Sequence, residues 1–139
     1  MATNWSDPNH PLMQQLSQST ADQVSTADAQ QAVKDLHSQV SPEQLKPVLE
    51  QHYSNMDPAQ LQATIAQLQQ ELAQQAKPET QQMVAQIDPA TATPQQAADL
   101  HAHAHQFHPE TIEKVALAGA GAAAVTGLAI LAARHFRNQ

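Results

Sequence analysis

The stretch VALAGAGAAAVTGLAILAA, from Val115 to Ala133, contains no charged side chain, and Arg134, His135 and Arg137 follow it closely. At about 1.5 Å per residue, a helix of this length matches the roughly 30 Å hydrocarbon thickness of a bilayer. We therefore expect a single C-terminal transmembrane helix. The alternative is an alanine- and glycine-rich helix buried in a soluble assembly, but the remaining chain has little apolar surface with which to surround it.

Small residues dominate one face of this predicted helix. Its strongly apolar side chains supply only about −2 to −3.5 kcal/mol of insertion free energy, so we expect it to have protein neighbours in the membrane. A small residue at every fourth position lets two helix backbones approach closely. The residues of this face are Gly119, Ala123 and Gly127, flanked by Ala116, Ala120 and Ala124. We expect the face to pack against a second copy of the chain or against a larger membrane complex.

The composition narrows the possible functions. Of the 139 residues, 41% are apolar and 3% aromatic, so the core is thin. Thirteen acidic residues and four lysines precede Val115, and no arginine precedes Arg134, so a nucleic-acid role is disfavoured. There is no cysteine, and the three glycines all lie in the apolar stretch, which argues against a thiol site and a phosphate-binding loop. We expect no enzymatic activity, no bound cofactor and no small-molecule substrate.

Proline marks the starts of the predicted helices. Ser41-Pro42-Glu43-Gln44 and Thr93-Pro94-Gln95-Gln96 are capping boxes with proline at the first helical position, and Asp57-Pro58-Ala59-Gln60 has the same form. The cap side chain accepts a hydrogen bond from a free N–H at the helix start, where proline has no N–H to lose. The pattern predicts helices over residues 27–39, 42–54, 58–76, 79–87 and 94–106, followed by the anchor from Pro109 onward.

The predicted helices carry narrow apolar stripes between glutamine-rich surfaces, as in Leu61, Ile65, Leu68 and Leu72. Stripes of this width suit pairwise packing of short helices in a small open bundle. We expect an all-α protein of three parts: a flexible N-terminal arm (1–26), an acidic, glutamine-rich bundle (27–108), and a C-terminal membrane anchor with a short basic tail (109–139). Trp5, in the arm, is a candidate anchor for the pocket of a partner protein.

Four histidines precede the apolar stretch in the sequence HAHAHQFH, which runs from His101 to His108. Helical spacing places His101, His105 and His108 on one face, where their imidazoles form a candidate site for Zn²⁺ or another divalent transition metal. Pro109 disfavours helical geometry at His108, and no HExxH motif accompanies the cluster, so a catalytic metal is not expected. A protonation switch at roughly pH 6 to 6.5 and an exposed polar linker are the alternatives.

These observations predict a single-pass membrane accessory subunit that docks on a larger membrane complex, with the bundle making protein contacts outside the bilayer. No secretory signal is visible, which favours a cytoplasmic body, whereas Arg134 and Arg137 favour a cytoplasmic C-terminus. We expect the body on the cytoplasmic side. Two alternatives stay open: a metal-binding or pH-responsive module built on the histidines, and a membrane-active protein whose helices oligomerise into a pore.

Overall fold

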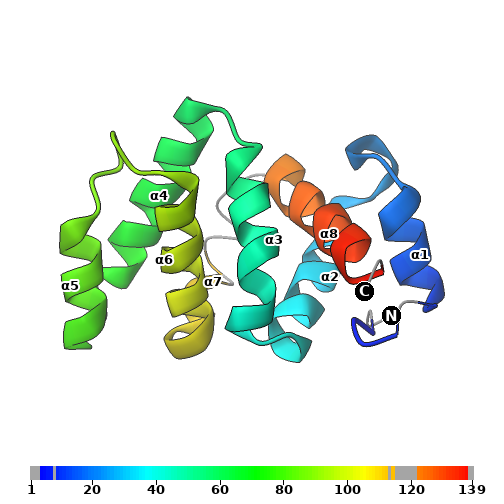
Figure 1. Cartoon of the computed structure of the whole chain (residues 1–139), viewed down its shortest axis with the longest axis horizontal. Helices are drawn as coiled ribbons and strands as arrows, with labels where there is room; N and C mark the ends of the chain where they lie inside the picture. The colour runs from blue at the N-terminus through cyan, green and yellow to red at the C-terminus, as the bar shows by residue number, and fades with distance from the viewer. Residues whose placement is uncertain (1–3, 8, 113, 115–121, 138–139) are drawn as a thin grey trace.

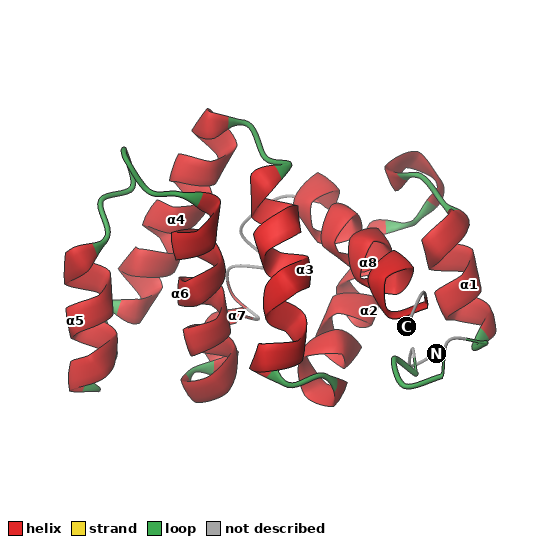
Figure 2. Cartoon of the chain, viewed as in Figure 1, coloured by secondary structure: helices red, strands yellow, loops and turns green. Residues whose placement is uncertain are grey.

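The computed structural model describes residues 4–7, 9–112, 114 and 122–137. Within these ranges the secondary structure is helical and contains no strand, which confirms the predicted all-α class (Figure 2). The elements, in chain order, are α1 (Pro11–Gln18), the short 3-10 helix η1 (Ala21–Gln23), α2 (Thr26–Gln39), α3 (Pro42–Ser54), α4 (Pro58–Leu72), α5 (Pro78–Gln86), α6 (Pro94–Phe107), α7 (Pro109–Ile112) and α8 (Ala122–Arg137).

The proline-marked helix starts lie where the sequence predicts them. Ser41 and Thr93 form capping boxes at the starts of α3 and α6, and the Asp57 carboxylate accepts the Gln60 backbone N–H at 2.7 Å at the start of α4. Each of these helices begins with proline, whose fixed backbone suits the first helical position. Pro47 does not end α3, which continues to Ser54.

The helices lie side by side along the long axis of the molecule (Figure 1). From one end they follow the order α5, then α4 with α6, then α3, then α8 with α2, and finally α1. Helix α3 is central, because it packs against α6 on one side and against α8 on the other. Helix α8 also packs against α1 and α2, so the C-terminal helix returns to the N-terminal part of the bundle.

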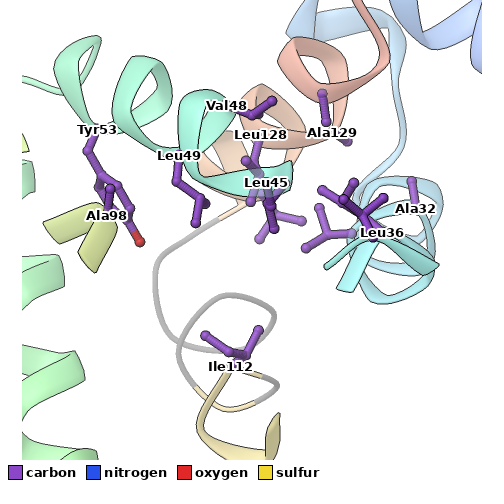
Figure 3. Packing of buried hydrophobic residues seen from close by; sticks show 14 of the residues in the cluster. Ala32, Leu36, Leu45, Val48, Leu49, Tyr53, Ala98, Ile112, Leu128 and Ala129 are labelled. Carbon is purple, nitrogen blue, oxygen red and sulfur yellow. The ribbon is translucent and has the colours of Figure 1, made fainter. Parts of the chain in front are cut away.

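The core runs along α3 and reaches into its neighbours. Leu45 and Leu49 are fully buried, and Tyr53 continues the same face of α3 toward α6 (Figure 3). The same buried cluster includes residues of α2, α6, α7 and α8, namely Ala32, Leu36, Ala98, Ile112, Leu128 and Ala129. Burial of apolar surface on this scale is the main free energy that holds such a bundle together.

The predicted transmembrane helix is not supported by the described residues, because none of their helices combines the length and apolarity needed to cross a bilayer. Residues 115–121 of the predicted span lie outside the described ranges. The part of the predicted span from Ala122 onward belongs to α8, which packs against α1, α2 and α3. Its inward side chains, all less than a tenth exposed, are Val125, Leu128, Ala129, Ala132 and Ala133. The apolar side chains of α8, which were expected to contact lipid, thus contact other helices of the bundle.

Part of the predicted N-terminal arm is helical in the structure. Its central part forms α1, whose Met13 and Leu16 are buried where α1 packs against α8. Trp5 is only 4% exposed, and its ring meets Phe136 edge to face at 6.1 Å between centroids. Its backbone N–H donates to the Gln39 side-chain oxygen at 3.0 Å. The indole of Trp5 therefore packs within its own chain.

The basic side chains after the apolar stretch also act within the fold. Arg134 donates from Nε to the Ser17 carbonyl at 2.9 Å and from Nη2 to the Ser19 carbonyl at 3.3 Å. Arg137 donates from Nη1 to the Ser17 hydroxyl at 2.9 Å. The last carbonyls of a helix lack partners within the helix, and cationic side chains satisfy them well. The predicted basic tail thus fastens the C-terminal end of α1 to α8.

Gly127 is the one residue of the predicted small-residue face whose surroundings are described. Gly119, Ala116 and Ala120 lie outside the described residues, and so do the side chains of Ala123 and Ala124. A Cβ added at Gly127 would meet nothing within 4 Å, so no close approach of another described element requires glycine here.

We expect Gly127→Ala to raise the free energy of unfolding by about 0.5 to 1 kcal/mol, because alanine restricts the unfolded backbone and Gly127 lies in a helix interior. Thermal unfolding followed by circular dichroism should show a rise of a few degrees in Tm. The reverse change at a buried position of the same helix, Ala129→Gly, should lower Tm. A lower Tm for Gly127→Ala would mean that this backbone does need glycine.

Candidate functional site

A network of buried and half-buried polar side chains lies where the ends of α2 and α3 meet α6. His37 comes from the last turn of α2, Tyr53 from the last turn of α3, and His101 and His105 from α6. The four-residue spacing places His101 and His105 on one face of α6. His101 is 2% exposed and Tyr53 3%. We call His37, Tyr53, His101 and His105 the histidine network.

The hydrogen bonds of this network fix the proton on each ring. His37 Nδ1 lies 2.7 Å from the Val33 carbonyl, which can only accept, so Nδ1 carries a proton and donates. In a neutral ring the other nitrogen, Nε2, is then bare, and it accepts from His101 Nε2–H at 2.7 Å. His101 Nδ1 is bare in turn and accepts from the Tyr53 hydroxyl at 2.7 Å. One unbroken chain of donors therefore runs from Tyr53 through His101 and His37 to the backbone of α2.

His105 completes the network from the next turn of α6. Its Nε2–H donates to the backbone carbonyl of His37 at 2.6 Å, and its ring meets the His37 ring edge to face at 4.8 Å. Its Nδ1 is buried and has no hydrogen-bond partner among the described residues. His37 is thus the central member, because its two ring nitrogens and its carbonyl oxygen are all engaged.

Burial keeps these imidazoles neutral. It lowers the pKa of His37 to about 4, with a smaller contribution from His105, and the hydrogen bond to Val33 only partly opposes this. Burial is also the main reason that the pKa of His101 is well below its usual value, and His37, His52 and His105 lower that pKa further. The pKa of His105 is lowered and that of Tyr53 raised by the same cause. An added proton would therefore place a charge among other imidazoles, and no carboxylate is among the described hydrogen-bond partners of these rings.

His52 lies beside the network on α3. Its ring packs against Tyr53 at 5.1 Å between centroids, and burial lowers its pKa to about 4. The ion pair at this junction of α3 and α6, Lys46 with Asp99 at 2.7 Å, is about half exposed at both side chains. It raises the pKa of Lys46 through the hydrogen bond and the charge of Asp99. Asp99 is thus already engaged by a lysine.

A second polar cluster joins α5 to the other end of α6. The Thr80 hydroxyl, fully buried, lies 2.6 Å from His103 Nε2 and 2.8 Å from His108 Nε2. Because a hydroxyl has a single proton, it donates to one ring and accepts from the other. The pKa of His103 is lowered, mainly by burial and next by His108. Thr80 is the only buried residue among the described residues of α5, and this contact joins α5 to α6.

Each of the three predicted metal ligands already makes hydrogen bonds to other groups of the protein. His101 bonds with His37 and Tyr53, His105 with the backbone of α2, and His108 with Thr80 on α5. Across the described ranges, no group of three or more histidine and acidic side chains is arranged to hold a metal ion. The sequence analysis did not identify His37, Tyr53 or Thr80, because each is far from the histidine cluster along the chain.

The arrangement is suited to sensing protons. Every described hydrogen bond of the network is satisfied with neutral rings, and the same bonds join α2, α3 and α6. Comparison with protein-family models, with curated proteins and with solved structures finds no match to this chain.

Proposed function

We propose that this protein is an acid-responsive helical bundle that acts at a membrane: near neutral pH its apolar C-terminal segment is held in the bundle, and in acid the segment is released to a bilayer. The observation that carries the proposal is the chain of hydrogen bonds from Tyr53 through His101 to His37, which neutral imidazoles satisfy completely. Protonation of His37 at Nε2 would place two N–H groups against each other at 2.7 Å.

The position of α8 connects this network to the apolar segment. Helix α8 packs against α2 and α3, and both of these helices contribute to the histidine network. A proton in the network weakens the hydrogen bonds that join α2 and α3 to α6. Because α2 and α3 also pack on the apolar side chains of α8, a shift of these two helices would uncover those side chains. Loss of that cover exposes Leu128, Ala129 and the other apolar side chains of α8.

The sequence supports a membrane as the destination. Residues 115–133 contain no charged side chain, and protonation of histidines offsets the net charge of −7, which reduces repulsion from anionic lipids. Once the segment is in lipid, its small-residue face suits close packing against a second copy or a membrane complex. In that state the chain would act as an accessory subunit, with its remaining helices on the cytoplasmic side.

Flotation with vesicles of phosphatidylcholine and phosphatidylglycerol tests this proposal. We expect the full chain to stay unbound at pH 7.5 and to float with the vesicles at pH 5. Leu131→Lys should abolish flotation at pH 5, because a lysine inside a membrane helix costs about 2.5 to 3.5 kcal/mol. Leu131 is half-buried, so this variant should fold at neutral pH.

The matched control is Leu12→Lys, a half-buried position on α1 outside the apolar segment. It adds the same charge and should float at pH 5 like the parent chain. Equal flotation at both pH values, or none at either, would refute acid release. Loss of flotation in both lysine variants would show that charge in general, and not insertion of the C-terminal segment, controls binding.

A further inference from the structure

A pocket of about 360 Å³ lies between the C-terminal ends of α1 and α3 and the side of α8. Its volume is within the usual range of small-molecule sites. The polar residues that line the pocket are Ser19, Thr20, His52, Asn55 and Arg134. The other lining residues are Gly127, Ile130 and Leu131. These residues come from three separate parts of the chain, so no local sequence motif marks the pocket.

The polar side of the pocket favours an anion. Arg134 is the only charged residue of the lining, in a chain whose net charge is −7. Its bonds to the Ser17 and Ser19 carbonyls use two of the five N–H donors of a guanidinium, and these bonds hold the side chain in place. The remaining donors include the end-on pair that binds a carboxylate with two hydrogen bonds.

Two further polar side chains line the pocket without engaging Arg134. The imidazole of His52 makes a ring contact with Tyr53 and no hydrogen bond to any described residue. The side-chain amide of Asn55 is exposed and makes no hydrogen bond to any described residue, so it is available to a ligand. Neutral donors of this kind orient a carboxylate beside a guanidinium.

The opposite side of the pocket is apolar and open. A Cβ at Gly127 would meet nothing within 4 Å, so the glycine leaves space above α8. Ile130 and Leu131 continue this wall by about one helical turn. The pocket therefore combines a cationic end with a short aliphatic wall.

We propose that this pocket binds a small aliphatic carboxylate, with the carboxylate at Arg134 and Asn55 and the hydrocarbon chain over Gly127, Ile130 and Leu131. The proposal concerns the folded protein at neutral pH and does not depend on acid release.

Titration of the ¹⁵N-labelled full chain with sodium octanoate at pH 7.5 tests the site. We expect saturable shifts at the backbone amides of Gly127, Leu131 and Asn55. Octanol, which has the same chain without the charge, should bind about tenfold more weakly or worse, because the charge-assisted hydrogen bonds are missing. Absence of saturable shifts up to roughly 10 mM octanoate would overturn the proposal, since binding weaker than this is not specific.

Gly127→Leu should fill the pocket and abolish octanoate binding, whereas its matched control Gly127→Ala should retain it. Asn55→Asp gives a second test at an exposed position, where a carboxylate on the pocket wall should weaken octanoate binding about tenfold or more and leave octanol binding unchanged. Unchanged octanoate binding in either Gly127→Leu or Asn55→Asp would overturn the assignment of the site. Equal affinity for octanoate and octanol would overturn carboxylate recognition.

Discussion

Between pH 6.5 and pH 4 the free energy of unfolding should fall steeply, by about 1.4 kcal/mol per pH unit for each histidine that stays neutral in the fold. His37 and His52 both have a pKa of about 4 in the folded state, against 6.5 for an exposed histidine. These two alone give a slope of nearly 3 kcal/mol per pH unit, and His101 and His105 add to it. A domain of ordinary stability, roughly 5 to 15 kcal/mol, would lose much or all of it in this window.

The direction of this effect follows from proton counting. Between the two pKa values the unfolded chain binds protons at these histidines and the folded chain does not, so acid favours the unfolded state. Above pH 6.5 both states are neutral at these positions, and the contribution is complete and constant. Below pH 4 the folded state also takes up the protons, and the contribution of His37 and His52 has been lost.

Urea unfolding followed by circular dichroism from pH 7.5 to 4.5 measures the slope. His52→Leu removes one half-buried imidazole that makes no hydrogen bond to a described residue, and it should reduce the slope by about one proton. His10→Asn is the control: His10 caps α1, outside the network, and asparagine can also cap a helix. Equal urea midpoints at pH 7.5 and pH 5 would contradict the neutral assignment of the network.

The helix starts could be predicted from the sequence because the interactions that fix them are local. Ser41, Asp57 and Thr93 each bond to a backbone N–H three residues ahead, and proline follows each of them directly. No distant part of the chain is needed to satisfy these groups. The predicted starts of α3, α4 and α6 agree with the structure for this reason.

The surroundings of α8 could not be predicted in the same way. An uncharged run rich in alanine and leucine has the same pattern in a membrane helix and in a buried helix. Its environment depends on α1, α2 and α3, which lie about a hundred residues away in the chain. In particular, Met13 and Leu16 are buried where α1 packs against α8.

The histidine network was predictable only in part. The spacing of His101 and His105 places them on one face of a helix, as the sequence analysis expected. Their partners are long-range: His37 precedes His101 by 64 residues and Tyr53 precedes it by 48. A pattern within one helix therefore identified the imidazoles but not the groups that set their protonation.

His101→Ala should lower the free energy of unfolding at pH 7.5 by about 3 to 4 kcal/mol, the second large effect that we expect. The substitution removes a ring that is 2% exposed and leaves a cavity between α3 and α6. It also leaves the Tyr53 hydroxyl and His37 Nε2 without their partner, and buried polar groups that lose a partner are costly. Urea unfolding at pH 7.5 measures the loss.

A double-mutant cycle with Tyr53→Phe separates the hydrogen bond from the packing. Tyr53→Phe keeps the ring and removes the donor to His101 Nδ1, so alone it should cost about 1 to 2 kcal/mol. In the His101→Ala background that donor has already lost its acceptor, so Tyr53→Phe should then cost little or even stabilise the fold. The resulting interaction energy should be about 1 to 2 kcal/mol. Strictly additive effects would mean that Tyr53 and His101 are stabilised by packing alone, and the proton arrangement derived for the network would then be wrong at its first bond.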